Sequence, residues 1–381
     1  MSVEARYQDL LTAVAFTGSR AVLRVTATYQ PAGGLGSRVF PPTYPPQNGQ
    51  PYVIEKRRVD GAERDDVLLD SVPSQANRAE EALLRAQREG TAQVPLLQVE
   101  HTGATPVVLS SLEFPHRYAD AYLRDSLLDG VAFDRTDLGR SLQGASPADA
   151  TALYAHDPGS LVYGAWNSHR KGRQQKFPRI YASEVVGWDP VLGARNAGRM
   201  DPLNLQGAAK QTKDGWEYSA TSTKTKGEKL SEIGHGNVAP NPQHGGVTIS
   251  SAQRFATLSL AGLDRIGFGA VSAEAAQAAR TVLAAYALLA DRLAFGRPAL
   301  WLRSGCELVL ESERIEWVHR GGDTEPFDLS TAEAIELFGL AAAHAEKQGL
   351  PLATETVVLT PSKALAQAID FSLTKASGEG D

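Results

Sequence analysis

Leu23-Arg24-Val25-Thr26-Ala27-Thr28-Tyr29 alternates apolar and polar side chains near the start of the chain. A period of two residues is typical of a strand that buries one face. Outward from this stretch, residues 31–46 are rich in proline and glycine, which excludes regular structure there. Residues 52–61 predict a second strand that ends in a turn, and residues 96–100 and 107–109 predict two short strands.

Helical patterns follow in both halves of the chain. A first helix is expected after Pro73 with Ser74 as its N-cap, because Ala76, Ala79 and Leu83 begin an apolar stripe. A second helix is expected between Phe114 and Leu128. The C-terminal half predicts a strand at 252–260, a helix at 272–295 capped by Ser272, strands at 300–302 and 308–310, and a helix from the Ser330–Glu333 capping box to about Lys347, followed by Gly349. This irregular alternation predicts an α+β fold.

Composition limits the class of protein. The chain has 381 residues, a formal net charge of −6 and one cysteine, Cys306, so an internal disulfide and CxxC zinc sites are excluded. A single cysteine is typical of a reducing compartment. No basic, apolar leader and no run of roughly 20 apolar residues occurs, so we expect a cytoplasmic protein that does not interact with membranes. Residues 190–250 are rich in Gly, Asn, Gln, Thr and Lys, a composition expected of functional or disordered segments.

The strongest local signal is a basic segment in the middle of the chain. Residues 166–179 read WNSHRKGRQQKFPR, and no carboxylate occurs between Asp157 and Glu184. Cations, amides and aromatic rings together suit single-stranded nucleic acid, because phosphates need donors and unstacked bases need planar partners. A solvated basic loop, or a loop that pairs with an acidic surface of a neighbouring subunit, would have the same composition.

Two further clusters give weaker signals. Gly33, Gly34 and Gly36 could let backbone amides approach a phosphate, although such a loop is more often a plain turn. The start of the predicted helix near Ser74 offers unpaired amides to an anion, although an ordinary helix cap explains it equally well. Walker loops, nucleophile elbows and HExxH motifs are absent from the sequence, and the eight histidines lack the spacing of a metal site. We therefore expect no catalytic residues, no metal and no cofactor.

Four blocks of sequence belong together. They read RVFPPTYP at 38–45, YVIEKRRVDG at 52–61, LLDSVPSQANRAE at 68–80 and YGAWNSHR at 163–170. In combination they resemble the CRISPR-associated RAMP backbone subunit of type I-G effector complexes, formerly called type I-U. The resemblance continues more diffusely into the C-terminal third.

The resemblance implies a fold and a function. It implies one RAMP-type domain over residues 1–381, with a modified RNA-recognition (ferredoxin-like) core and thumb-like or web-like insertions at about 31–66 and 190–250, the second mobile when RNA is absent. It implies a non-catalytic subunit that binds the backbone of CRISPR RNA. Its copies would assemble head to tail along the guide with other effector subunits, in an antiviral surveillance complex that pairs the guide with a target DNA strand.

The resemblance also suggests candidate contacts to the guide. Within the blocks these are Arg38, Lys56, Arg57, Arg58, Ser74, Gln75, Asn77, Arg78, Ser168, His169 and Arg170, and charge adds Lys171, Arg173, Gln174 and Lys176. Glu55 and Asp70 could equally be internal partners of Arg57 and Arg78. The alternative is a metal-independent endoribonuclease that processes guide precursors, with His169 as general acid or base beside Arg170 and Lys171.

Overall fold

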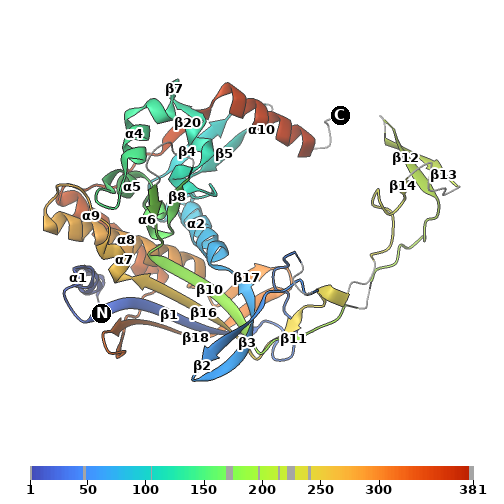
Figure 1. Ribbon diagram of the computed structural model, residues 1–381, viewed down its shortest axis with the longest axis horizontal. Helices are drawn as coiled ribbons and strands as arrows, with labels where there is room; N and C mark the ends of the chain where they lie inside the picture. The colour runs from blue at the N-terminus through green and yellow to red at the C-terminus, as the bar shows by residue number, and fades with distance from the viewer. Residues whose placement is uncertain are drawn as a thin grey trace.

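A long antiparallel sheet organises the protein. The computed structural model describes residues 2–45, 49–103, 105–168, 175–195, 198–212, 215–220, 228–238 and 242–376. The main sheet has the order β17-β18-β1-β16-β10-β3-β2, and β19 pairs with β18 (Figure 1). Its strands are β1 (Arg20–Pro31), β2 (Ile54–Val59), β3 (Ala62–Asp70), β10 (Tyr181–Trp188), β16 (Ser251–Ser259), β17 (Ala299–Arg303), β18 (Cys306–His319) and β19 (Thr324–Pro326).

The alternation of β1 determines which face of this sheet is buried. Leu23, Val25, Ala27 and Tyr29 are buried, and the threonines and arginine between them lie half-buried on the other face. The predicted strands at 52–61, 252–260, 300–302 and 308–310 are confirmed as β2, β16, β17 and β18. Because β2 and most of β3 fall within residues 31–66, that segment supplies one edge of the main sheet.

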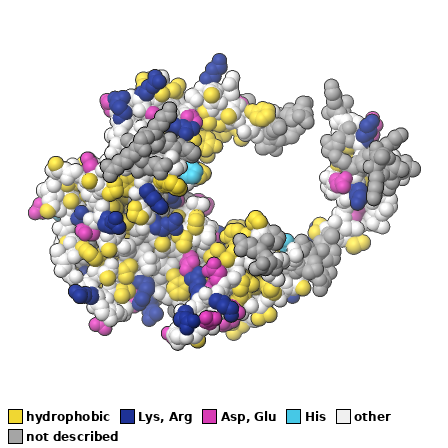
Figure 2. All heavy atoms as spheres, viewed as in Figure 1, with side chains coloured by type: hydrophobic (Ala, Val, Ile, Leu, Met, Phe, Trp, Pro, Cys, Tyr) yellow, Lys and Arg dark blue, Asp and Glu magenta, His cyan; other side chains and the backbone are white. Residues whose placement is uncertain are grey.

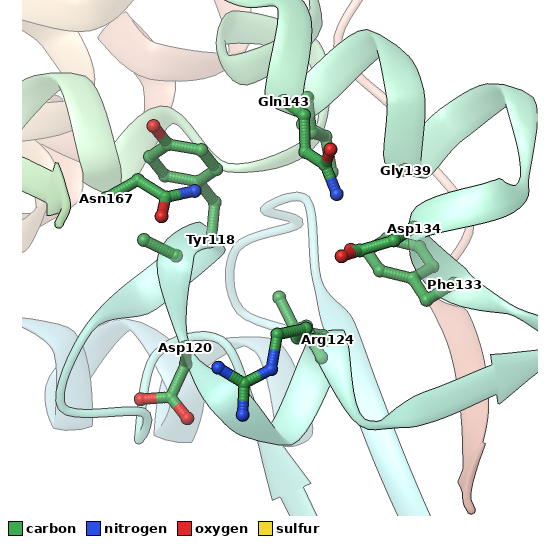
Figure 3. A pocket seen from close by; sticks show the side chains of 11 residues that line it. Tyr118, Asp120, Arg124, Phe133, Asp134, Gly139, Gln143 and Asn167 are labelled. Carbon is green, nitrogen blue, oxygen red and sulfur yellow. The ribbon is translucent and has the colours of Figure 1, made fainter. Parts of the chain in front are cut away.

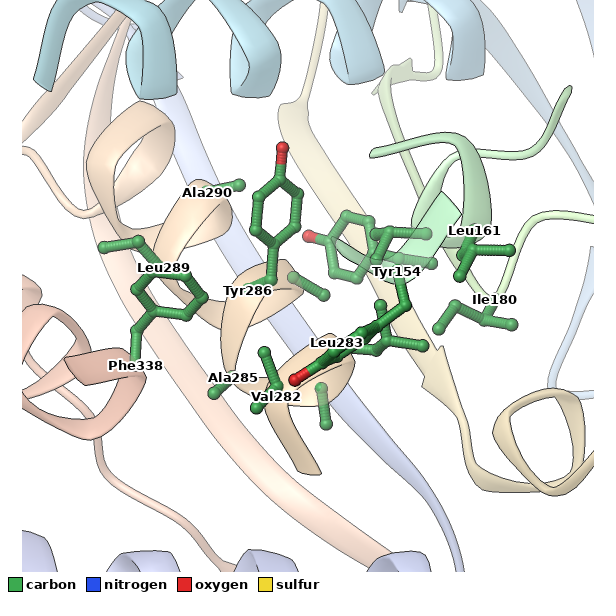
Figure 4. Packing of buried hydrophobic residues seen from close by; sticks show 14 of the residues in the cluster. Tyr154, Leu161, Ile180, Val282, Leu283, Ala285, Tyr286, Leu289, Ala290 and Phe338 are labelled. Carbon is green, nitrogen blue, oxygen red and sulfur yellow. The ribbon is translucent and has the colours of Figure 1, made fainter. Parts of the chain in front are cut away.

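Helices cover the buried face. They are α1 (Val3–Val14), α2 (Val72–Arg88), α7 (Leu260–Asp264), α8 (Ala273–Phe295) and α9 (Thr331–Lys347). The predicted caps of the last two helices are confirmed: Ser272 accepts a hydrogen bond from the amide of Ala275, and Ser330 and Glu333 form a capping box. Figure 4 shows α8 packed between Phe338 of α9 and the side chains of Leu161 and Ile180. Its many alanines let neighbouring elements approach closely, so α8 is the centre of the core.

A smaller sheet lies at one end of the molecule, in the order β5-β4-β20-β6-β7. Its strands are β4 (Leu97–His101), β5 (Val107–Ser110), β6 (Ser126–Leu128), β7 (Val131–Ala132) and β20 (Val357–Pro361), and around it lie η1 (Arg117–Ala119), α3 (Ala121–Arg124), η2 (Phe133–Arg135), α4 (Asp137–Gly144), α5 (Thr151–His156), α6 (Pro158–Val162) and α10 (Lys363–Ala376). The predicted helix at 114–128 is wrong. Arg117 adopts a left-handed backbone conformation with φ 52°, and Asp120 caps a new short helix, so the segment divides into η1, α3 and β6.

An arm projects from the end of the main sheet. Residues 191–248 leave and re-enter the body as β11 (Val191–Leu192) and β15 (Val247–Thr248), with η3 (Pro242–His244) just before β15. The far end holds β12 (Ala208–Thr212), β13 (Gly215–Ser219) and β14 (Glu228–Lys229). Figure 2 shows a wide hollow between this arm and the part of the molecule where Figure 1 places α10.

The predicted α+β fold is confirmed, since helices and mainly antiparallel sheets share one core. Among the described residues, no helix combines the length and the apolar character that crossing a bilayer requires.

Candidate nucleic-acid interface

The start of α2 forms an internal polar cluster around Asp70. The cap of this helix is Ser71, whose hydroxyl accepts from the amide of Ser74, so the predicted cap at Ser74 is wrong by one turn. Pro73 suits the first turn of a helix, where its missing N–H costs no hydrogen bond, and this lets the helix begin before it. Ser74 instead donates its hydroxyl hydrogen bond to Asp70 over 2.7 Å.

Asp70 is fully buried, and its carboxylate accepts hydrogen bonds from four side chains. Gln75 and Arg78 donate to one of its oxygens over 2.5 and 2.8 Å, and Arg303 donates to the other over 3.3 Å. Arg78 also donates to the carbonyl of Leu302. The suggested internal pairing of Asp70 with Arg78 is therefore present, and the polar groups of three predicted RNA contacts stabilise the junction of α2 with β17. Asn77, which follows Ser74 by three residues on α2, is exposed.

The basic hairpin β2–β3 is likewise paired with carboxylates. Arg57 lies 2.6 Å from Glu184 and 2.6 Å from Asp66, and Glu55 is 4.0 Å away. The hydrogen bond to Glu184 is the largest of the effects that raise the pKa of Arg57 above its ordinary value. Lys56 pairs with Asp65 and Arg58 with Glu63 across the two strands, and these pairs are exposed. Exposed pairs stabilise a fold by about 0–1 kcal/mol, so phosphate can compete for them more easily than for Arg57.

Arg38 connects the first insertion to the base of the arm. Its guanidinium donates to the carbonyls of Ala194 and Gly245 over 3.3 and 3.4 Å. Nearby, Val39 forms a bridge with Val247. The two predicted insertions therefore meet at the root of the arm, an arrangement that composition could not indicate.

The hairpin of β8 (Ala165–Asn167) and β9 (Gln175–Phe177) presents an exposed aromatic ring and a cation side by side. Trp166 lies directly opposite Lys176, whose ammonium is 5.7 Å from the centre of the indole ring. Trp166 is 55% exposed. An aromatic face next to a cation is the arrangement that binds a stacked base and its phosphate.

Ser168 ends the described part of this hairpin and is half-buried. His169, Arg170, Lys171, Arg173 and Gln174 lie outside the described residues.

Arg179 is a cation that the sequence analysis did not select. It is exposed, and with Asn77 and Arg117 it lines a cavity of about 100 Å³ beside the start of α2. The guanidinium of Arg117 is already paired, because it binds the buried carboxylate of Glu80 at 2.6 Å. Neither Arg179 nor Lys176 forms an ion pair with any residue that the structure describes. Arg179 belongs to the carboxylate-free segment, so a signal for it was present in the sequence.

A second cavity of about 450 Å³ opens beside β8, between Asn167 and the short elements η1, η2 and α4 (Figure 3). Its wall is apolar where Phe133, Leu123 and Leu142 contribute. Polar atoms come from Asp134, Gln143, Asn167, Asp120 and Arg124. The sequence offers no signal for this site, because its residues are brought together only by the packing of short elements.

Residues 23–191 match the profile of a family described as CRISPR-associated protein GSU0053 (Cas_GSU0053). The match indicates a CRISPR-associated protein family. It covers somewhat less than half of the chain and extends from within β1 to the first residue of the arm. It therefore includes Asp70 with its partners Ser74, Gln75 and Arg78, the β2–β3 hairpin, the β8–β9 hairpin and both cavities, whereas Arg303 of the Asp70 cluster lies outside it. A search of curated proteins finds no match.

Proposed function

We propose that the chain is a non-catalytic subunit that binds the sugar-phosphate backbone of CRISPR RNA in a DNA-targeting surveillance complex. The observation on which this rests is the carboxylate-free basic segment between Asp157 and Glu184, inside the part of the chain that matches a CRISPR-associated family. On a chain of net charge −6, cations concentrated along one track bind a strand while the remaining acidic surface discourages non-specific binding.

The order of the central strands supports an RNA-recognition type of core. In chain order, β1, α2, β10, β16, α8 and β18 form a βαββαβ series, and the four strands lie in the sheet as β18-β1-β16-β10. This is the arrangement of ferredoxin-like domains, in which each helix connects two parallel strands that flank a third. On this interpretation β2, β3, the smaller sheet and the arm are additions to a common core.

The described cations support contact with phosphate rather than with base edges. Lys176 and Arg179 can bind a phosphate without breaking an ion pair with any described residue, and Trp166 offers a ring face to a base of any identity. Sequence reading is then left to pairing between guide and target. The arm exposes Leu203 (77%) and Met200 (70%), together with Tyr218, and such a surface suits contact with another copy of the chain along the guide.

Replacing Arg170, Lys171 and Arg173 with alanine tests the proposal. We expect weaker binding of guide RNA and a shallower dependence of log K on log salt, by about 0.7 for each phosphate of a single strand that the variant no longer neutralises. The matched control removes three exposed arginines that pair with carboxylates elsewhere, Arg85, Arg88 and Arg140. Unchanged affinity and an unchanged salt slope in the first variant would refute the assignment.

The endoribonuclease alternative makes a separate prediction. If His169 is a general acid or base beside Arg170 and Lys171, purified protein cleaves repeat RNA without added metal, and His169→Ala stops the cleavage. We expect intact RNA on a denaturing gel with the unmodified protein. Cleavage that disappears in His169→Ala would replace the scaffold by a nuclease.

A further inference from the structure

We propose that the cavity beside β8 binds one extruded guanine base of the bound RNA strand. This inference rests on the proposed function and adds a base-specific site to a subunit otherwise expected to bind backbone. The cavity measures about 450 Å³, within the range of roughly 300–1,000 Å³ typical of small-molecule sites. It combines apolar walls with a few convergent polar groups, which is the composition of sites that hold a planar heterocycle.

The two acids that line the cavity play different roles. Asp120 is buried, and its oxygens accept hydrogen bonds from the backbone amides of Tyr122 at 2.9 Å and His116 at 3.0 Å. It therefore holds the wall in place. Asp134 is half-buried, and among the described residues the only hydrogen-bond partner of its carboxylate is the side chain of Gln143. Burial raises the pKa of Asp134, as expected of an acid that faces a poorly solvated space.

Side chains from four elements, α3, η2, α4 and β8, line the same space. Figure 3 shows Asp134 and Gln143 facing each other across one side of the cavity, with Asn167 opposite them and Arg124 below. Arg124 uses two of its nitrogens on Asp125, at 2.9 and 2.8 Å, so its charge is compensated outside the cavity. The acceptor that faces the cavity is thus the carboxylate of Asp134, which already has Gln143 as a hydrogen-bond partner and is flanked by amide groups that can donate or accept.

Guanine is the base that complements this set of groups. Its pairing edge has two adjacent N–H donors beside a carbonyl oxygen, so a carboxylate can accept both hydrogen bonds while an amide donates to the carbonyl. Adenine and cytosine each place a ring-nitrogen acceptor against the carboxylate, and uracil has one donor between two carbonyls. Phe133 is buried and contributes only a small part of the apolar wall. The cavity is also reached from β8, whose Trp166 we place against the strand, so the base and its backbone would occupy adjacent surfaces.

The test measures binding of the full chain to short oligouridines that contain one central guanosine, inosine, adenosine or cytidine. We expect the guanosine strand to bind about tenfold more tightly than plain oligouridine, as one bidentate contact allows, with inosine between them because it lacks the exocyclic amine. Asp134→Asn should remove this preference and leave affinity for plain oligouridine unchanged. The matched control is Asp137→Asn, which removes a carboxylate that is fully exposed on the neighbouring helix.

The outcomes separate the two proposals. Equal affinity for all strands, or a guanosine preference that survives both Asp134→Asn and Gln143→Leu, would overturn the base site while the backbone scaffold stands. Failure to bind any of the strands would overturn the scaffold and the base site with it. If free guanosine monophosphate binds as tightly as the guanosine strand and does not displace plain oligouridine, the ligand is a free nucleotide and the assignment to the guide is wrong.

Discussion

Asp291→Asn tests the buried charge network that joins α8 to the main sheet. Asp291 and Arg254 are fully buried, and Arg254 donates to Asp291, as does the hydroxyl of Tyr181. Arg292 donates to the other oxygen of Asp291 over 2.8 Å. Burial opposes the charge on Asp291, but Arg254 and Arg292 outweigh it and hold the pKa of this carboxyl below its ordinary value.

The magnitude follows from what the substitution leaves behind. Within the described residues Asp291 is the only anion paired with Arg254, and one nitrogen of Arg254 already lacks a hydrogen-bond partner. Arg292 retains Glu313 at 2.5 Å. Removing one partner of a buried pair costs about 3–5 kcal/mol, because it leaves a buried charge uncompensated. We therefore expect the free energy of unfolding to fall by about 3–5 kcal/mol, mostly through Arg254.

The assay is urea unfolding followed by tryptophan fluorescence, to which the buried Trp188 and Trp317 of the main sheet report. Glu81→Ala is the control, because it removes an exposed pair with Arg85 on α2 and should cost only about 0.3–0.5 kcal/mol. Replacing both Arg254 and Asp291 by apolar residues of similar volume should recover much of the stability. A decrease below about 1 kcal/mol in Asp291→Asn would show that the network does not stabilise the packing of α8 on the sheet.

Two further substitutions test the region around the cavities. Burial raises the pKa of Asp157 to about 6, above the value of about 3.9 in an unfolded chain, so the stability contributed by its neutral form is complete below about pH 4 and is lost as pH rises through 6. Asp157→Asn keeps a good N-cap, and we expect this variant to be more stable than the unmodified chain by up to about 3 kcal/mol at pH 7.5, with no gain at pH 4. The midpoints of urea unfolding at the two pH values measure this difference. An equal difference at both pH values would contradict the expectation. Gly139→Ala should lower the free energy of unfolding by about 1–3 kcal/mol, although alanine has the better helix propensity, because the added Cβ would overlap the carbonyl of Phe133. Gly144→Ala, at the open end of α4, should leave thermal unfolding unchanged. Equal effects of the two alanines would refute the steric reasoning.

Elements with a complete local signal could be predicted from the sequence. The alternation at Leu23–Tyr29, the Ser272 cap of α8 and the Ser330–Glu333 capping box each specify an element through neighbours a few residues apart, and all three are confirmed. The segment 114–128 failed because its conformation depends on distant residues. Arg117 there takes a left-handed backbone conformation while it binds Glu80 and the carbonyl of Gly164. The two partners, Glu80 and Gly164, lie 37 and 47 positions away along the chain, so no local sequence pattern encodes this stabilisation.

The candidate site shows the same division between local and distant information. A sequence shows where cations are but not which of them already have partners. Arg57 reads as a surface cation, yet its strongest partner, Glu184, lies 127 positions away. Gln75 reads as a polar residue in the first turn of a helix, yet it is buried and bound to Asp70, Ser183 and Arg254.

If the chain binds RNA as proposed, these internal partners narrow the surface on which the strand can lie. A phosphate that approaches Arg57 or Arg78 competes with a buried carboxylate already within 3 Å of the guanidinium. Drawing the arginine away would leave Asp66 without Arg57, or Asp70 with Arg303 as its remaining cation. Leaving a buried acid unpaired costs more than one exposed phosphate interaction returns. Phosphate binding by Lys176 has no such cost, because its ammonium faces only the ring of Trp166 among the described residues. On energetic grounds the strand should therefore follow the β8–β9 hairpin, while the clusters at α2 and β2–β3 hold the core that positions it.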